Sequence, residues 1–300
     1  MAIASDSFTG VDLSRLPAPT VIEPLSFEII YADALAQFQT YFPEFDATVE
    51  SDPVVKLLQL FAYRELVLRQ RVNDAARAVM PAYAVGADLD TLAAIVGVER
   101  FVLDPGDPEN QVPPTLESDD DLRRRMVLAP EGFSVAGPEG AYIFHALSAD
   151  GDVLDASAVS PSPGEVVVTV LSRTGDGTPS ADVLAAVENK LTDRAIRPLT
   201  DAVIVQGADI EPFAINATLT FLSGPDRSLV LAEAQARLNS HLAATLRLGR
   251  DVTRAGIIAA LHPEGVQNIA LASPAADIVL TRQQAGYCTG ITLLDAGVGE

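Results

Sequence analysis

The chain has 300 residues, of which 48% are hydrophobic and 20% are charged, so it can form two or three domains with cores. Acidic residues outnumber basic ones by 41 to 20, and the resulting net charge of -21 argues against nucleic acid or an anionic membrane as a partner. The single cysteine, Cys288, cannot form an internal disulfide bond. Without a signal-peptide pattern or an apolar run of ~20 residues, we expect a soluble protein made in a cytoplasm.

The amino-terminal part of the sequence has a helical period. Asp52 and Ser51 are candidate caps for a long helix that has Pro53 at its first position and runs to Met80. The pattern predicts helices over residues 25–42, 53–80 and 88–96, after an opening that Pro17, Pro19 and Pro24 keep extended.

The predicted helix 53–80 carries more apolar surface than one core face needs. One stripe contains Val54, Leu57, Leu58, Phe61, Leu68, Val72 and Val79, and Val55, Leu60, Tyr63, Leu66 and Val67 cover much of the remainder. Leaving four such side chains exposed would forgo ~6–12 kcal/mol. The helix is therefore either the centre of its own domain or part of a bundle with another subunit. Its basic residues, Arg64, Arg69, Arg71 and Arg77, form a solvated face or meet an acidic partner.

A change of structure follows this helical part. Residues 103–118 hold four prolines and no periodicity, which predicts an exposed linker. Ser118 is a candidate cap for the next helix, and Asp119, Asp120 and Asp121 would occupy its first turn.

Strand patterns begin near Val153. A hairpin over 153–172, a helix over 180–195 and a strand over 201–210 form one predicted unit. The second has a strand over 213–222, helices over 224–246 and 252–262, and strands over 266–273, 277–281 and 287–294. The fold class is therefore α+β: an amino-terminal helical arm, then two small α+β modules with helices on one face of a mixed or antiparallel sheet.

The segment APEGFSVAGPEGAYIFHA, residues 129–146, contains residue types that occur in active sites. Its Ser134 lacks the spacing of a nucleophile elbow, and no strand precedes it. The turn at Gly137 places Glu139 where a phosphate would sit, so Glu139 is better explained as a first-turn acid of a helix that begins at Pro138. His145 would lie inside that helix as a packed or surface residue. We therefore expect no catalytic residue here.

Metal and cofactor sites are not expected either. The three histidines are far apart in sequence, and Cys288 has no partner cysteine. Asp150, Asp152 and Asp155 are spaced like part of a calcium loop, but the glycine and the closing glutamate of that motif are missing. The consecutive residues Asp119 to Asp121 point in different directions on a helix and cannot share one ion. The sequence thus favours assembly over enzymatic chemistry.

Long runs of residues resemble a known family. The carrying segments are AYRELVLRQRVNDAARAVM, DDDLRRRMVLAPEGFSVAGPEGAYIFHALSADGDVLDASAVSPSPGEVVVTVLS, IRPLTDAVIVQ, LGRDV and PAADIVLTRQQAGYCTGITL. They resemble, in the same order from about Leu13 to Leu294, the baseplate assembly protein J family of contractile-tailed bacteriophages.

The resemblance implies a structural role in the tail baseplate of a virion that assembles in the host cytoplasm. In that family two copies combine with another wedge protein through amino-terminal helices, and wedges form a ring around the central hub. The implied partners are a second copy of the chain and other wedge and hub proteins, without cofactor, nucleic acid, membrane or small-molecule substrate. The expected divisions are a helical arm over 1–102, a linker with a short helix over 103–130, a central domain over 131–207 and a carboxy-terminal domain over 208–300.

Two sets of residues are the candidates for this role. The candidate interface residues on the long helix are Phe61, Arg64, Leu68, Arg69, Arg71 and Val72. Gly132, Gly137 and Gly140 are candidate joint residues that let the backbone turn between the arm and the modules. The ring would relay the trigger for sheath contraction. Alternatives are a baseplate wedge of a headless injection particle and a tail-borne cell-wall hydrolase.

Overall fold

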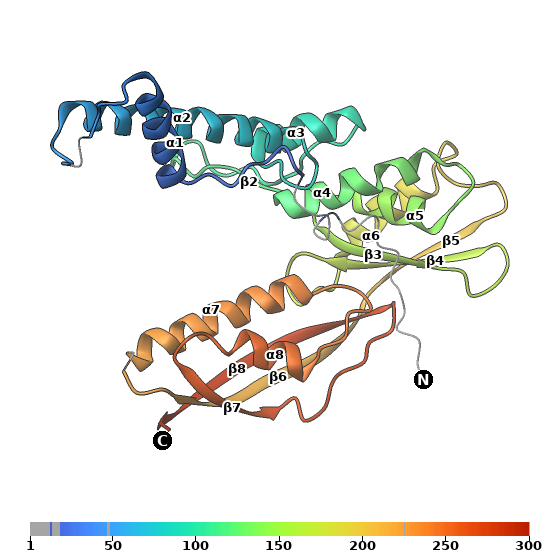
Figure 1. Ribbon diagram of the computed structural model, residues 1–300. Helices are drawn as coiled ribbons and strands as arrows, with labels where there is room; N and C mark the ends of the chain where they lie inside the picture. The colour runs from blue at the N-terminus through green and yellow to red at the C-terminus, as the bar shows by residue number, and fades with distance from the viewer. Residues whose placement is uncertain (1–12, 14–18, 47–48, 225, 300) are drawn as a thin grey trace. The chain divides into compact units, whose positions relative to one another are not determined.

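The computed structural model describes residues 13, 19–46, 49–224 and 226–299 (Figure 1). The chain divides into two compact units, one within residues 11–99 and the other within residues 100–300. Helices come first and sheet-containing modules follow, which confirms the α+β class. Pro17, part of the predicted extended opening, lies outside the described residues.

The amino-terminal unit is helical, as predicted. Asp52 caps the long helix by accepting the backbone N–H of Val54 at 2.7 Å, with Pro53 in the first turn. Buried Asn73, within the same helix, exchanges two hydrogen bonds with the backbone of Glu23, at 2.8 and 3.0 Å. The helices are α1 (Phe27–Tyr41), α2 (Pro53–Ala78) and α3 (Gly86–Ile95), and α1 packs against α2.

The second unit opens with the region predicted to be a linker. Most of residues 103–118 are exposed, as expected, but β1 (Val102–Asp104) and β2 (Thr115–Leu116) pair as short antiparallel strands. Helix α4 (Asp119–Leu128) then begins at the predicted cap, where the hydroxyl of Ser118 accepts the N–H of Asp121 at 3.2 Å. A short 3-10 helix, Ala129–Phe133, follows it directly.

The central module has a mixed sheet with the order β3-β4-β5, in which β4 pairs antiparallel with β3 and parallel with β5. Apolar side chains of α5 and α6 pack against it, so one face of the sheet is covered by helices, as predicted. The elements are α5 (Glu139–Leu147), β3 (Val153–Val159), β4 (Glu165–Ser172), α6 (Ala181–Leu191) and β5 (Ala202–Gly207).

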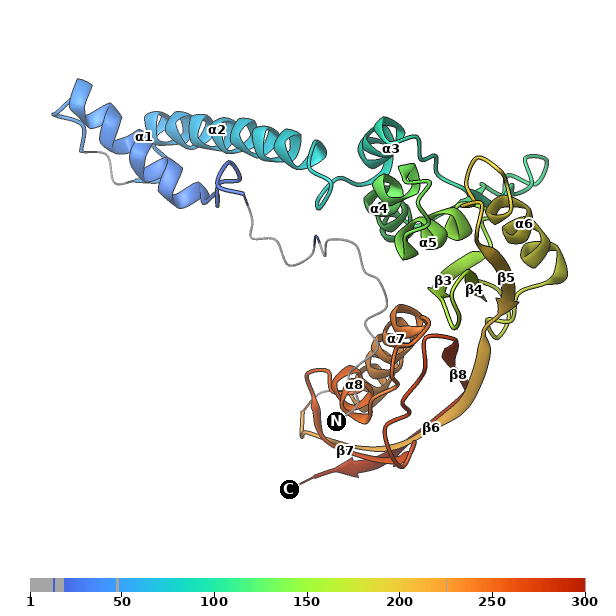
Figure 2. The ribbon, with the colours of Figure 1, turned by 90° about the vertical axis from the view of Figure 1, so that its right-hand side faces the viewer.

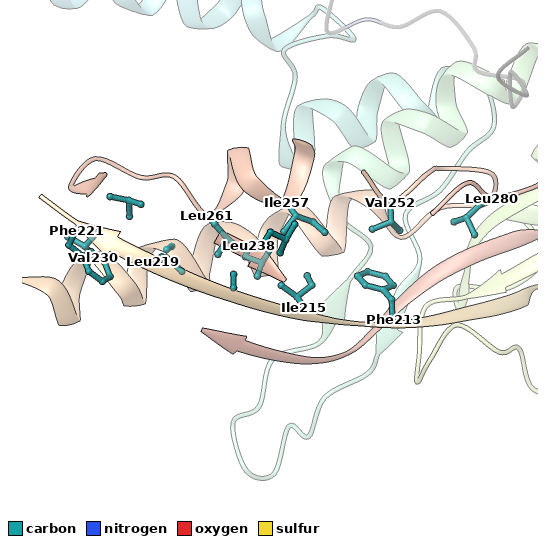
Figure 3. Packing of buried hydrophobic residues seen from close by; sticks show 14 residues of the cluster. Phe213, Ile215, Leu219, Phe221, Val230, Leu238, Val252, Ile257, Leu261 and Leu280 are labelled. Atoms are coloured by element: carbon teal, nitrogen blue, oxygen red, sulfur yellow. The ribbon is translucent and has the colours of Figure 1, made fainter. Parts of the chain in front are cut away.

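The carboxy-terminal module has a second mixed sheet, with the order β7-β6-β8. Helices α7 and α8 lie on the same side of it (Figure 2). Alternate residues of the central strand, including Phe213, Ile215 and Leu219, point into the core toward Leu238 and Ile257 of the helices (Figure 3). The elements are β6 (Asp209–Phe221), α7 (Arg227–Thr245), α8 (Arg254–Ala260), β7 (Val266–Ser273) and β8 (Gln284–Val298).

The predicted strand over 277–281 is wrong. Ile278 forms only an isolated bridge with Val252. The carboxylate of Asp277 accepts the N–H of Arg254 at 2.7 Å, and the N–H of Leu280 donates to Asp251 at 2.8 Å. These hydrogen bonds tie the segment to the start of α8 instead of to the sheet.

An ionic cluster joins the two modules. Asp121 of α4 accepts a hydrogen bond from Arg173, after β4, at 2.7 Å, and another from Arg247, after α7, at 3.0 Å. Burial opposes ionisation of Asp121, but the hydrogen bond from Arg173 and the charges of both arginines outweigh it and lower the pKa of this carboxyl. We call Asp121, Arg173 and Arg247 the arginine clamp.

Other contacts lie beside the arginine clamp. Buried Asp155 of β3 accepts the guanidinium of Arg124 at 2.6 Å and the backbone N–H of Leu248 at 2.9 Å. Leu171, Leu248 and Ala285 form a small apolar cluster on the face of the central sheet that the helices leave open. Both faces of β4 are therefore buried, and the modules form one unit.

The arginine clamp makes a testable prediction about stability. Asp121→Asn leaves two arginines without their shared carboxylate, so we expect the free energy of unfolding to fall by about 3 kcal/mol in denaturant titrations at pH 7. The control is Asp120→Asn, because Asp120 is 93% exposed and, among the described residues, pairs with neighbouring Arg123 alone. Loss of its charge should change the free energy of unfolding by within about 0.5 kcal/mol.

The same clamp predicts the pH dependence. Since the native pKa of Asp121 is lowered, its contribution is complete above the unfolded value of about 3.9 and is lost as pH falls through the native pKa. The stability difference between the wild type and Asp121→Asn should therefore shrink in acid. A difference that stays constant down to pH 2, or equal effects of the two substitutions at pH 7, would contradict the clamp.

Candidate assembly surface

Helix α2 packs one face and leaves another exposed. Its buried residues are Val55, Leu58, Ala62 and Asn73. On another face, residues spaced by three and four positions form a continuous row that we call the α2 seam: Leu57, Phe61, Arg64, Leu68, Val72, Ala75 and Val79. The large apolar side chains from Leu57 to Val72 in this row are between 51% and 66% exposed. Such spacing is typical of a helix that packs against another helix.

The six predicted interface residues do not all share the seam. Phe61, Arg64, Leu68 and Val72 belong to it, and all four are exposed. Arg71 is also exposed, on the neighbouring row. Arg69 instead forms an ion pair with Glu65 at 2.7 Å and approaches Glu23 at 3.7 Å, so its charge is partly neutralised within the unit.

The sequence motif at residues 129–146 does not form a catalytic arrangement in the described structure. The hydroxyl of Ser134 accepts the N–H of Ala136 at 3.3 Å, and Nε2 of His145 lies 3.2 Å from the carbonyl oxygen of Gly132. Burial lowers the pKa of His145, although its contact with Gly132 partly opposes the shift. His145 lies in α5, as predicted, and α5 begins at Glu139 rather than at Pro138, which is its cap.

The three candidate joint glycines lie within the unit of residues 100–300. Gly137 has a left-handed backbone with φ of +73°, and a Cβ there would lie 2.7 Å from Cγ of Pro198. A Cβ at Gly132 would lie 2.2 Å from the ring of Phe144, so close packing requires glycine there. Gly140 is buried in the first turn of α5. Each glycine thus has a packing or backbone role, and their action as a joint remains a prediction.

The acidic motifs are used in hydrogen bonds and ion pairs. Asp119, Asp120 and Asp121 contact different arginines: Arg100 for the first, Arg123 for the second and the two clamp arginines for the third. This confirms that they point in different directions. Within the described residues no group of three or more His, Cys, Asp or Glu could hold a metal ion. Among the described helices, none has the length and hydropathy needed to cross a bilayer.

Sequence reasoning did not identify the ionic contacts that join the modules. Asp155 could have indicated such a contact, because a carboxylate inside an otherwise apolar strand is stable only with a buried partner. Arg247, which follows α7, carries no comparable local signal, since its partner Asp121 lies 126 positions away.

Comparisons with known proteins agree with the resemblance noted in the sequence. Three family models match the chain: the Baseplate J-like N-terminal domain over residues 50–107, the central domain over 134–207 and the C-terminal domain over 213–294. The first match contains all of α2 and α3, and the other two contain most of the two α+β modules.

A relative and a solved structure complete the comparisons. The chain is 47% identical to Baseplate protein J of Escherichia phage P2 over 300 residues, covering 97% of this chain and 99% of the relative. A chain in a cryo-EM structure of the anti-feeding prophage baseplate has a TM-score of 0.37 and 16% identity, covering 49% of this chain and 36% of that chain. Identity at this level over nearly the full length, with the three domain matches in order, shows that this chain belongs to the Baseplate J family.

Proposed function

We propose that this chain is a structural component of a contractile-tail baseplate wedge, in which the α2 seam forms a helical bundle with other subunits. A phage baseplate role is supported by the family and by the relative in phage P2. The finer assignment, a wedge built from two copies and another wedge protein, is our inference. The α2 seam is the observation that carries it.

Burial of the seam would supply binding energy. The large apolar side chains of the seam from Leu57 to Val72 are between 51% and 66% exposed, so covering the rest of four such residues would contribute about 3–6 kcal/mol. The exposed apolar row would otherwise remain in contact with water on a helix whose other face is packed. A partner helix with its own 3–4 apolar spacing fits this surface.

Arg64 supplies specificity within the same surface. It lies in the middle of the seam and has no ion-pair partner within the described part of the chain. Because a buried guanidinium needs a carboxylate partner, the helix that packs here should carry Asp or Glu opposite Arg64. In-register parallel packing of two identical seams would bring two arginines together, so we expect the second copy to be offset or to contact a third helix.

The remaining role follows from the assembly. Wedges would join in a ring around the central hub, and rearrangement of their interfaces would relay the trigger for sheath contraction. The free energy would come from the sheath, so this chain needs neither an enzymatic activity nor a cofactor for the step. A headless injection particle would use the same interfaces. If capsid proteins are encoded and produced together with this chain, the particle is a phage; if they are absent, it is a headless injection particle.

The α2 seam can be tested by introducing a charge. Leu68→Asp or Phe61→Asp should abolish wedge formation, because the carboxylate would be buried in the bundle without a partner. Stability of the isolated chain should change by within about 0.5 kcal/mol, since both side chains are more than half exposed. Co-purification of coexpressed baseplate proteins measures assembly, and thermal melting measures stability.

The matched control is Gln70→Asp, at an exposed α2 position outside the seam. It should leave wedge formation intact. Normal particles from Leu68→Asp would refute the seam as an interface.

The charge preference of Arg64 is tested separately. Arg64→Glu should weaken wedge assembly about tenfold or more, equivalent to about 1.4 kcal/mol, because it would face the partner's carboxylate. Arg64→Lys keeps the positive charge and should retain most of the affinity. Titration of the purified components at low and high salt provides the measurement, and equal binding by the Glu and Lys variants would show that no acidic residue lies opposite.

The glycine joint predicts that Gly137→Val impairs assembly more than stability. Strain at φ of +73° and the contact with Pro198 will also cost about 1–3 kcal/mol of stability, so a control with similar strain is needed. Gly175→Val provides it, because Gly175 has φ of +66° with no atom near its Cβ position. Ring yield, counted by electron microscopy, should fall further for Gly137→Val. Equal yields from the two variants would count against the joint.

A further inference from the structure

Strand β8 has a free edge. It pairs with β6 in parallel and, among the described strands, with no other. At the opposite edge of the same sheet, the guanidinium of Arg254 donates to the carbonyl oxygens of Leu271 and Pro274, at the end of β7. The edge of β8 therefore offers backbone groups that could pair with a further strand.

β8 has few of the features that usually prevent a free edge strand from pairing with another chain. The eleven residues from Gln284 to Leu294 carry no charge and no proline, although the chain as a whole has a net charge of -21. Proteins commonly protect edge strands with lysine, proline, inward-pointing charges or bulges. β8 has a bulge at Thr289, whose hydroxyl donates to the carbonyl oxygen of Phe213 at 3.0 Å.

Between the bulge and Leu294 the strand is regular. Residues Gly290–Leu294 pair in continuous register with Ala214–Thr218 of β6. The next residue, Asp295, pairs with Arg227 of α7 at 3.1 Å and marks the end of the uncharged stretch. A stretch of this length is sufficient to add one short strand.

A groove lies beside this edge. It has a volume of about 450 Å³ and runs between α7 and β8. Gln235, Asn239 and Ala243 line it from the helix, and Cys288, Gly290 and Ile291 line it from the strand. None of its lining residues is charged. A strand added to β8 would direct alternate side chains toward the α7 side, where the groove could hold a large apolar side chain.

We propose that the edge Gly290–Leu294 binds an extended segment of a different protein, which adds as a fourth strand and places an apolar side chain in the groove. The segment lacks acidic residues and carries Lys or Arg beyond its paired part, because the exposed residues Asp209 and Glu211 of β6 lie opposite Gln284 and Gly286, at the start of the uncharged stretch. A second copy of β8 is a poor occupant, because its own uncharged stretch is followed by Asp295 and not by Lys or Arg. The inference concerns the carboxy-terminal module and does not depend on the α2 seam.

The single cysteine provides the test. Cys288 lines the groove and is half-buried, so an added strand should cover it. Alkylation of wild-type chain by iodoacetamide is followed by mass spectrometry at one fixed pH, in purified free chain and in assembled tails. We expect the rate in tails to be at least tenfold lower. Hydrogen exchange of the 290–294 backbone amides, measured on the same samples, should also slow at least tenfold, which reports strand pairing itself.

A variant tests whether slower alkylation and slower hydrogen exchange both depend on the edge of β8. A Cβ at Gly290 meets no atom within 4 Å, so Gly290→Lys should fold normally while placing a lysine on the edge where the added strand would pair. Tails containing it should lose the protection of Cys288 or incorporate less of the chain. Ala270→Lys, at an exposed position of β7, is the control and should behave like wild type.

Three results would overturn the proposal. The first is equal alkylation and exchange rates in free chain and in tails. The second is protection of Cys288 without slower exchange at 290–294, which means that the groove is covered but no strand is added. The third is protection of Cys288 in the purified chain at concentrations at which the chain forms a dimer. That result would assign the edge to a second copy. Because wild-type tails are used, failure of the α2 seam proposal would leave these readouts unchanged.

Discussion

The carboxylate of Asp121 is shared by two arginines, one from each α+β module, and the arrangement of residues 100–300 depends on this contact. An exposed ion pair contributes little to stability, but the side chain of Asp121 is only 12% exposed, and its removal would leave two arginines without their shared partner. The neighbouring hydrogen bond from Leu248 to Asp155 and the small apolar cluster around Leu171 reinforce the same junction. The two modules therefore form one compact unit.

The amino-terminal unit has the opposite character. Helix α2 uses Val55, Leu58 and Ala62 for internal packing and leaves the apolar α2 seam exposed. Its apolar residues resemble those of a core, and Arg64 within the seam resembles a specificity element of a helical bundle. On an acidic chain, an apolar row with a cationic centre selects partners by shape and by charge together. Such selection suits the proposed helical bundle.

Much of the fold could be predicted from local patterns, because caps and periodicity are encoded by nearby residues. The caps at Asp52 and Ser118 and the strands β3 and β7 are examples. The excess apolar surface of α2 was also predictable, but which face packs against α1 depends on tertiary structure. The false strand at 277–281 arose because hydrogen bonds to Asp277 and from Leu280 use its polar groups elsewhere. Arg247 could not be assigned to Asp121, since long-range ion pairs leave no local pattern.

The central claim is that the α2 seam contacts other baseplate subunits. The most direct measurement replaces Phe61 with a photo-reactive phenylalanine analogue, which preserves the size of a side chain that is 61% exposed. The tagged chain is irradiated inside assembled particles, and cross-linked peptides are identified by mass spectrometry. The account predicts cross-links to helices of a second copy or of another wedge protein, near an acidic residue. Particles that incorporate the chain but yield no cross-link from this position would contradict it.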